Sequence, residues 1–279
     1  MINAEYTLGV AFIGAGNMAY ALSAGLVGKR CAADQVLAID PDATARAKWQ
    51  ELGTHTAERP DAQLQQYSIW IVAVKPQQIK EVLQACQPYV QEHTLIISVA
   101  AGISSYTLAT ALGTSQQPHQ RIIRAMPNTP AFIACGATGL LALEAVNTQE
   151  KNLAEQLFKT VGEVVWVDTD ADIDAVTALS GSGPAYVFLF LEALIQGAID
   201  QGLGPDQARK LAFATVKGAT ELAALSPLPL EELKANVTSK GGTTAAALQV
   251  FEQQHFSRIV QQAMQAAQQR AAALSNEFS

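Results

Sequence analysis

The first half of the chain alternates short, uniformly apolar runs with segments whose apolar residues recur at helical spacing. The apolar runs are LGVAFI (8–13), QVLAID (35–40), SIWIVAV (68–74), TLIISVA (94–100) and RIIRAM (121–126). The helical segments between them begin near residues 17, 43, 77 and 104. Strands that lack a polar face are typical of a parallel sheet that helices cover on both sides. The pattern therefore predicts a doubly wound α/β domain.

A different pattern fills the rest of the chain. After EVVWVD (163–168) the strand pattern stops, and Ala-rich and Leu-rich segments with helical spacing continue to the end. The polar joint DTDADID (168–174) can begin a helix, so we expect a first domain over residues 1–168 and an all-helical domain over 169–279. The helices expected at 185–199 and 208–225 carry more apolar surface than the core of so small a domain can bury. This excess favours dimerisation through the second domain.

Charge and hydropathy argue against several classes of partner. The net charge of -7 comes without a block of Lys and Arg, so a nucleic-acid partner is not expected. The beginning of the sequence shows neither the basic region nor the cleavage site of a leader, which favours a cytoplasmic protein. The most apolar segment, 185–199, is shorter than the roughly 20 residues of a membrane span and carries Glu192. We expect an interface helix there and no membrane partner.

The cysteines and histidines are dispersed. Cys31, Cys86 and Cys135 stand in apolar surroundings and form no CxxC pair, which favours inert core thiols in a reducing compartment. The four histidines lie far apart in the sequence, so we expect no metal site.

A glycine motif, GAGNMA at 14–19, directly follows the first apolar run and opens the first helical segment. Gly14 permits a tight turn, Gly16 lets backbone amides approach a pyrophosphate, and Ala19 allows close packing of the helix on the strand. The motif at this place predicts that the first domain is of the Rossmann type and binds a dinucleotide.

The preferred dinucleotide stays open. Asp40 ends the second apolar run, where an acid binds a ribose 2′-hydroxyl and repels a 2′-phosphate, which favours NADH. Arg46 in the following helix could weaken that preference, and Asp40 could instead cap the helix ahead of Pro41. NADPH and NADH are therefore both candidate cofactors.

Three further loops follow apolar runs: AVKP (73–76), SVAAG (98–102) and MPNTP (126–130). Ligands of open α/β sheets bind beyond the carboxyl ends of the strands, and small residues there leave room for a nicotinamide. Lys75 is either a cofactor contact or a solvated lysine at a helix start. MPNTP, with two prolines around Asn128, could be only a rigid turn.

A second glycine motif, VTSKGGTT at 237–244, precedes the helical run AAALQVFEQQ. Amides at the beginning of a helix are unsatisfied, and the helix dipole favours negative charge there. The order of a P-loop is not met because Lys240 precedes the glycines, so a small carboxylate fits better than a triphosphate. The alternative is that Thr243 or Thr244 merely caps the helix.

These motifs together resemble those of the pyrroline-5-carboxylate reductases. The resemblance rests on GAGNMA, AVKP, SVAAG, RAMPNTP, ALSGSGPAY (178–186) and VTSKGGTT in this order, and it runs from residue 9 to residue 265. It implies the last step of proline biosynthesis, in which NADPH or NADH reduces the imine of 1-pyrroline-5-carboxylate to L-proline. It also implies a homodimer formed by the helical domain, active sites that use elements of two subunits, and in some relatives a decamer built as a pentamer of dimers.

The resemblance further implies a set of site residues. The cofactor would contact Ile13, Gly14, Ala15, Gly16, Asn17, Met18, Asp40, Ala73, Val74, Lys75, Pro76, Val99, Ala101 and Asn236. The substrate would contact Ser239, Gly242, Thr243 and Thr244. Two positions depart from the family pattern: Asp170 replaces a glutamate of some relatives, and Lys240 replaces the usual proline.

Chemistry assigns roles within the substrate set. A protonated imine is already electrophilic, so the protein needs mainly to align the reacting carbons and exclude water. Thr244 is the candidate catalytic residue, with its hydroxyl on the ring nitrogen, and the amides of Gly242 and Thr243 would hold the carboxylate.

Two alternatives remain. A β-hydroxyacid dehydrogenase would need a general-base lysine on the helix GPAYVFLFLEAL (183–194), which has none. A non-catalytic sensor module that binds NAD(P) would need the first domain but not the VTSKGGTT motif.

Overall fold

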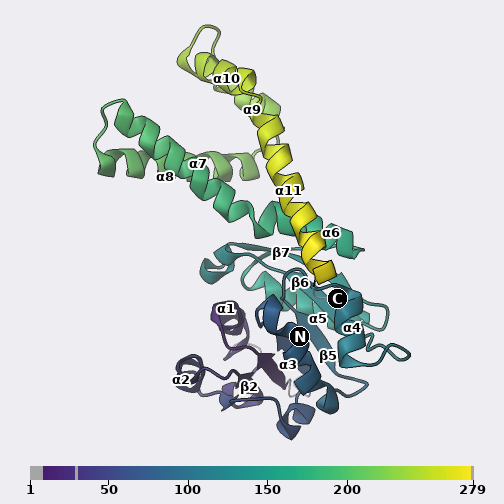
Figure 1. The fold of residues 1–279 in the computed structure, drawn as a ribbon. Coiled ribbons are helices and arrows are strands. Elements are labelled where there is room, and N and C mark those ends of the chain that lie inside the picture. The colour runs from purple at the N-terminus through teal and green to yellow at the C-terminus, as the bar shows by residue number, and fades with distance from the viewer. Residues whose placement is uncertain (1–8, 29–30, 278–279) are drawn as a thin grey trace. The chain divides into compact units, whose positions relative to one another are not determined.

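The computed structural model describes residues 9–28 and 31–277, so Leu8 of the first expected strand lies outside the described residues. The chain forms two compact units: residues 1–182 together with 267–279 make up unit 1, and residues 183–266 make up unit 2 (Figure 1). This division falls later than the boundary expected at residue 168, because α6 (Asp170–Val176) packs on the sheet of unit 1. At Gly139 of that sheet, an added Cβ would lie 2.8 Å from the side chain of Val176.

Within its described residues, unit 1 is built on one sheet of eight strands in the order β3-β2-β1-β4-β5-β6-β7-β8. The strands are β1 Val10–Ile13, β2 Val36–Ile39, β3 His55–Ala57, β4 Ile69–Val72, β5 Leu95–Ser98, β6 Ile122–Met126, β7 Gly136–Ala142 and β8 Gly162–Trp166. All neighbours pair in parallel except β6 and β7. The doubly wound parallel sheet is confirmed, and its strand order reverses at β1, which lies between β2 and β4.

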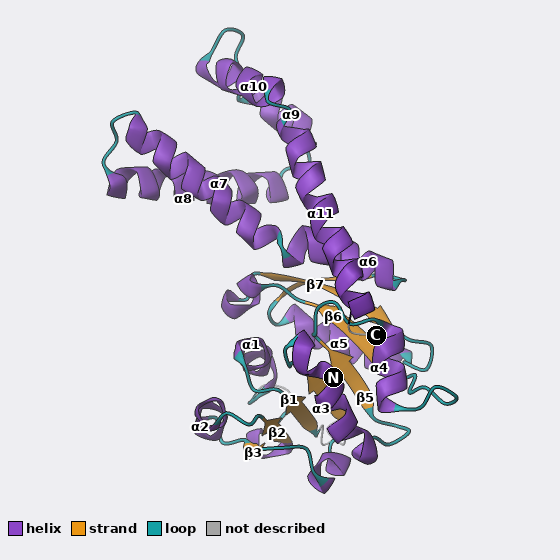
Figure 2. Ribbon diagram, viewed as in Figure 1, coloured by secondary structure: helices purple, strands orange, loops and turns teal. Residues whose placement is uncertain are grey.

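Helices cover both faces of this sheet (Figure 2). Besides α6, they are α1 Asn17–Leu26, α2 Ala43–Glu51, α3 Ile79–Cys86, α4 Ser105–Leu112 and α5 Thr148–Lys159. Short turns complete the unit: η1 Ala33–Gln35, η2 Ala62–Gln66, η3 Pro76–Gln78, η4 Gln87–Tyr89, η5 Thr129–Ile133 and the π-helical η6 Thr177–Gly181.

Local sequence explains where several helices begin. Asp42 caps α2 by accepting a hydrogen bond from the Thr44 amide, and Ser104 caps α4 by accepting from Thr107. Asn147 and Glu150 form a capping box at α5, as Thr169 and Asp172 do at α6.

Successive strand residues point to opposite faces, so the sheet supports two hydrophobic cores. On one face Phe12 and Ile71 pack with Trp49 and Phe158 in a core to which α1, α2 and α5 contribute. On the other face Ile13, Val72 and Ile96 pack in a core with residues of α3 and α4, among them Leu83 and Leu108. Both faces are buried, which is why the strands show no polar face in the sequence.

Unit 2 contains only helices and turns, which confirms an all-helical second part of the chain. Its helices are α7 Gly183–Asp200, α8 Pro205–Leu225, α9 Leu230–Asn236, α10 Thr243–Gln253 and the first part of α11 Phe256–Glu277. α7 and α8 pack side by side (Figure 1). Many of their large apolar side chains are exposed, among them Phe188, Leu189 and Leu225.

One stretch of the described chain, Asp170–Asp200, is long and apolar enough to cross a membrane by length and composition alone. A core helix of a soluble protein can meet the same criteria, so one such stretch is weak evidence for a membrane span.

Candidate coenzyme and substrate sites

The loop after β1 adopts a conformation that only glycine tolerates well. Gly14 has a φ of +95°, and a Cβ there would lie 2.7 Å from the carbonyl oxygen of Ala73. The Gly14 amide donates to the carbonyl of Ile39 at 2.8 Å, which ties the loop to the end of β2. Gly14 therefore brings the chain close to two neighbouring strands before α1 begins.

The beginning of α1 is open. Gly16 is the N-cap residue, no side chain caps the helix, and its first turn carries no acidic residue. A Cβ at Gly16 would meet no atom within 4 Å, so the space before the helix is free. Unsatisfied amides, a favourable dipole and free space are what a pyrophosphate requires, and the loop fits a dinucleotide.

The ends of β2, β4 and β5 extend this site, because these strands and β1 are neighbours in the sheet. Asp40 follows β2, Ala73–Pro76 follows β4, and Val99 and Ala101 follow β5. The structure thus brings the expected cofactor residues of unit 1 to one edge of the sheet, where open α/β folds bind ligands. Asn236, at the end of α9, belongs to unit 2, and its contact with the cofactor stays a prediction.

The Asp40 side chain is fixed in this loop. Its Oδ2 accepts from the Ala15 amide at 2.8 Å and its Oδ1 from the Asp42 amide at 2.9 Å. The alternative that Asp40 caps α2 is wrong, because the N-cap is Asp42. The indole of Trp49 donates to the carbonyl of Ala15 at 3.1 Å and holds the loop from the side of α2.

The second glycine motif leads into α10. Gly241 has a φ of +73°, and Gly242 is the N-cap of a helix that no side chain caps. The alternative that Thr243 or Thr244 caps this helix is therefore wrong. A Cβ at Gly242 would lie 2.4 Å from the Ser239 hydroxyl and 3.2 Å from the Ser239 carbonyl oxygen, so a larger residue here would force the Ser239 side chain to move.

One expected role within this motif needs revision. The Gly242 amide donates to the carbonyl of Ser239 at 3.0 Å, so it is already used inside the turn. The first intrahelical bond runs from the Ala246 amide to the Gly242 carbonyl, which leaves the Thr243 and Thr244 amides among the unsatisfied groups of the first turn. These two amides replace the pair Gly242 and Thr243 as candidates to hold a carboxylate.

Two buried polar groups near the sheet edge escaped the sequence analysis. Asn128 in the MPNTP loop donates to the Ser180 carbonyl at 3.0 Å and accepts from the Ala137 amide at 2.8 Å. Arg124 on β6 is buried and pairs with Asp170 at the beginning of α6. Asp170 thus serves an ion pair within unit 1. The sequence feature that could have drawn attention to Asn128 is its place between two prolines.

The thiols differ in exposure. Burial raises the pKa of Cys86 to about 12, and burial with nearby Asp34 raises the pKa of Cys31 to about 11, so both are inert core thiols as expected. Cys135 is exposed, so its assignment to the core is wrong. It lies just beyond η5, where the apolar neighbours Phe132 and Ile133 are exposed as well.

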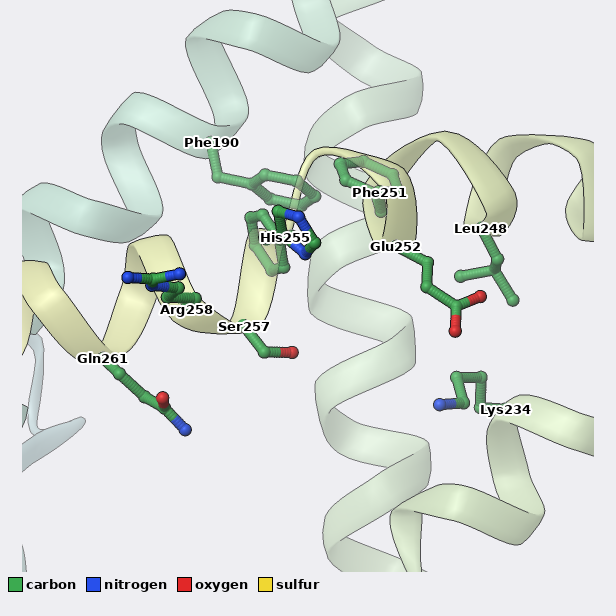
Figure 3. A pocket seen from close by; sticks show the side chains of 10 residues that line it. Phe190, Lys234, Leu248, Phe251, Glu252, His255, Ser257, Arg258 and Gln261 are labelled. Atoms are coloured by element: carbon green, nitrogen blue, oxygen red, sulfur yellow. The ribbon is translucent and has the colours of Figure 1, made fainter.

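Unit 2 also contains a cavity of about 860 Å³ between α7, α9, α10 and α11 (Figure 3). Phe190, Phe251 and Phe256 contribute its apolar wall, and Lys234, Glu252 and Arg258 its charged groups. The ring centroids of Phe251 and Phe256 lie 5.2 Å apart. None of the expected substrate residues lines this cavity, so it is distinct from the turn before α10.

A doubly wound sheet with an open glycine loop at its switch point, followed by an all-helical unit, is typical of NAD(P)-dependent oxidoreductases. Family profiles match two parts of the chain: "NADP oxidoreductase coenzyme F420-dependent" over residues 9–102 and "Pyrroline-5-carboxylate reductase dimerisation" over residues 170–274. The pyrroline-5-carboxylate reductase of Pasteurella multocida is 41% identical over 96% of this chain and 98% of its own length. The chain belongs to the pyrroline-5-carboxylate reductase family.

Solved structures agree with this assignment. A pyrroline-5-carboxylate reductase from Coxiella burnetii superposes with a TM-score of 0.87 at 36% identity, covering 97% of this chain and 99% of the other. The enzyme from Plasmodium falciparum, solved with NADP bound, has a TM-score of 0.83 at 29% identity and covers 96% of this chain and 98% of its own. These likenesses favour the reductase over the β-hydroxyacid dehydrogenase and the sensor module.

Proposed function

We propose that this chain reduces 1-pyrroline-5-carboxylate to L-proline, with the substrate bound at the beginning of α10. The reaction adds a hydride to the imine carbon and leaves a proton on the ring nitrogen, so that C=N becomes CH–NH. The observation that carries the proposal is the uncapped first turn of α10, which follows two glycines and offers amides to a small anion.

The coenzyme part of the site belongs to unit 1. NADPH or NADH supplies the hydride when it is bound. The open first turn of α1 would hold its pyrophosphate, with Gly14, Ala15 and Gly16 shaping the loop and Asn17 and Met18 beginning the helix. The small residues after β4 and β5, Ala73, Val99 and Ala101, leave room for a flat ring.

The substrate part belongs to unit 2. The amides of Thr243 and Thr244 would bind the carboxylate, which the positive end of the α10 dipole also favours. The hydroxyl of Thr244 would accept a hydrogen bond from the protonated ring nitrogen and so orient the imine carbon. Thr244 acts by alignment, because a protonated imine needs no further activation to accept a hydride.

The assembly follows from unit 2 as well. The dimerisation profile covers residues 170–274, and α7 and α8 expose large apolar side chains such as Phe188 and Leu211. Such faces are typical of interfaces between subunits, which supports a homodimer. A decamer of five dimers is the larger assembly that we propose. The cytoplasm is the compartment that we propose, because the buried thiols of Cys31 and Cys86 form no disulfide.

The proposal is tested by Thr244→Ala, Thr244→Ser and Thr243→Ala. Coenzyme oxidation and proline formation are followed with 1-pyrroline-5-carboxylate. Loss of one hydrogen bond to a charged group should lower kcat/KM of Thr244→Ala by about 10- to 100-fold, and serine should restore most of it. Thr243→Ala is the matched control, because Thr243 is exposed and contributes only its amide. Equal kcat/KM for wild type and Thr244→Ala would remove the assigned role of Thr244.

A further inference from the structure

The turn after β2 is acidic. Asp40 and Asp42 lie on either side of Pro41, and the two side chains take part in different backbone contacts. The Asp40 carboxylate accepts from the amides of Ala15 and Asp42, while Asp42 accepts from Thr44 as the cap of α2. Asp40 is therefore held at the glycine loop, and Asp42 is exposed beside it. A third carboxylate, Glu58, follows the neighbouring strand β3, whose last residue, Ala57, accepts from the Asp40 amide at 3.1 Å.

Two arginines near this turn have acceptors among neighbouring residues. Arg46 on α2 uses its Nη1 to donate to the carbonyls of Asp40 at 2.6 Å and Pro41 at 2.9 Å. Its guanidinium thus closes the turn from the side of α2. Arg59, on the next strand end, pairs with Glu58 at 3.3 Å. A phosphate at this turn would lie close to carboxylates, and the Nη1 of Arg46 is already held by two backbone carbonyls.

We infer that this chain selects NADH over NADPH, and that Asp40 and Asp42 set the selectivity. The inference rests on the proposed function for its reaction, but it concerns only the adenosine end of the coenzyme. A carboxylate fixed at the end of β2 accepts from the 2′-hydroxyl of a ribose. The same carboxylate repels a 2′-phosphate, and a like-charge contact is a large penalty in a partly buried turn.

The test measures binding of NAD⁺ and NADP⁺ by isothermal titration calorimetry, without substrate. Wild type should bind NAD⁺ about 10- to 100-fold more tightly than NADP⁺, because the two nucleotides differ only in the 2′-phosphate. Asp40→Asn and Asp42→Asn should each narrow this ratio by tightening NADP⁺, and the double variant should narrow it further. At position 42, asparagine keeps an acceptor for the Thr44 amide, and at position 40 its single amide oxygen keeps an acceptor for one of the two backbone amides that Asp40 binds.

Two controls separate charge at this turn from other effects. Glu92→Gln removes one negative charge from an exposed residue just before β5, at the end of the sheet where the parallel strands begin. It should leave the ratio of NAD⁺ to NADP⁺ affinity unchanged. Arg46→Gln should change the affinities for NAD⁺ and NADP⁺ by the same factor, because Arg46 donates to the backbone of the turn and not to a phosphate. A selective loss of NADP⁺ affinity in Arg46→Gln would instead identify Arg46 as a phosphate ligand and overturn the inference.

Kinetics with both coenzymes distinguish this inference from the proposed function. Turnover of 1-pyrroline-5-carboxylate with a higher kcat/KM for NADH supports both. Turnover with equal or higher kcat/KM for NADPH, together with NADP⁺ binding at least as tight as NAD⁺, overturns the selectivity and leaves the reaction in place. Tighter binding of NAD⁺ without turnover of this imine by either coenzyme supports the selectivity and overturns the reaction.

Discussion

The guanidinium of Arg124 and the carboxylate of Asp170 form an ion pair that joins β6 to the first turn of α6. The Arg124 side chain is only 4% exposed, so its charge depends on this partner. Asp170 also accepts from the hydroxyl of Ser105 at 2.7 Å, which adds α4 to the contact. A single carboxylate therefore connects a strand and two helices within unit 1.

Asp170→Ala should lower the free energy of unfolding by about 3 kcal/mol, because the buried Arg124 charge loses its ion-pair partner and keeps only the weaker attraction of Asp174. Chemical denaturation of the variant and wild type measures the difference. Asp168→Ala, at an exposed position two residues earlier, is the matched control and should change it by less than about 0.5 kcal/mol. Equal losses in the two variants would show that the pair does not stabilise unit 1.

The two glycines of the first motif should respond differently to alanine. Gly14→Ala places a Cβ 2.7 Å from a backbone oxygen at a φ of +95°, so we expect a loss of more than about 2 kcal/mol of stability. Gly16→Ala meets no atom within 4 Å and should stay within about 1 kcal/mol of wild type. Its coenzyme affinity should nevertheless fall at least about tenfold, because the methyl group occupies the approach to the α1 amides. Thermal unfolding and coenzyme titration separate the two effects, and unchanged affinity in Gly16→Ala would contradict the assigned site.

His119 should make stability depend on pH. Burial lowers the pKa of His119 below its usual 6.5. The hydrogen bond with the Thr94 carbonyl raises this pKa, and the nearby charge of Arg121 lowers it, so that the net shift is downward. A group whose pKa is lower in the folded state binds fewer protons there, so its stability contribution is present above pH 6.5 and is lost as the pH falls through the folded pKa.

We therefore expect His119→Gln to lose less stability than wild type between pH 6.5 and the folded pKa. Glutamine keeps a donor for the Thr94 carbonyl and cannot titrate. His93→Gln, at an exposed position, serves as the control and should follow the wild-type curve. Parallel curves for His119→Gln and wild type, measured by denaturation at several pH values, would show that His119 does not titrate differently on folding.

Much of the fold could be predicted because most strands are buried on both faces. Uniform apolar runs identified β1, β2, β4, β5, β6 and β8, and helical spacing identified α1, α2, α3 and α4 but not α5. β3 has only three residues, none of which is buried. β7 contains two glycines and a threonine. Neither strand therefore appears in the sequence as an apolar run. The antiparallel pairing of β7 with β6 could not be foreseen, because it depends on a return of the chain through η5 rather than on composition.

The candidate site was predictable in part, for a similar reason. Local patterns located the glycine loop, Asp40 and the turn before α10. They could not show that the Gly242 amide is used by the Ser239 carbonyl, since that depends on the conformation of the turn. The partners of Asp170 and Asn128 lie many residues away in the sequence, so only the fold brings them together.

The most direct measurement compares 1-pyrroline-5-carboxylate with 1-pyrroline, the same imine without its carboxylate, at saturating coenzyme. If the amides of Thr243 and Thr244 hold that carboxylate, kcat/KM should be at least about 100-fold higher for 1-pyrroline-5-carboxylate. Replacing Thr244 with proline removes its amide and should reduce this ratio, and Thr243→Ala should retain it. Equal kcat/KM for the two imines in the wild-type protein would contradict binding of the substrate at the beginning of α10.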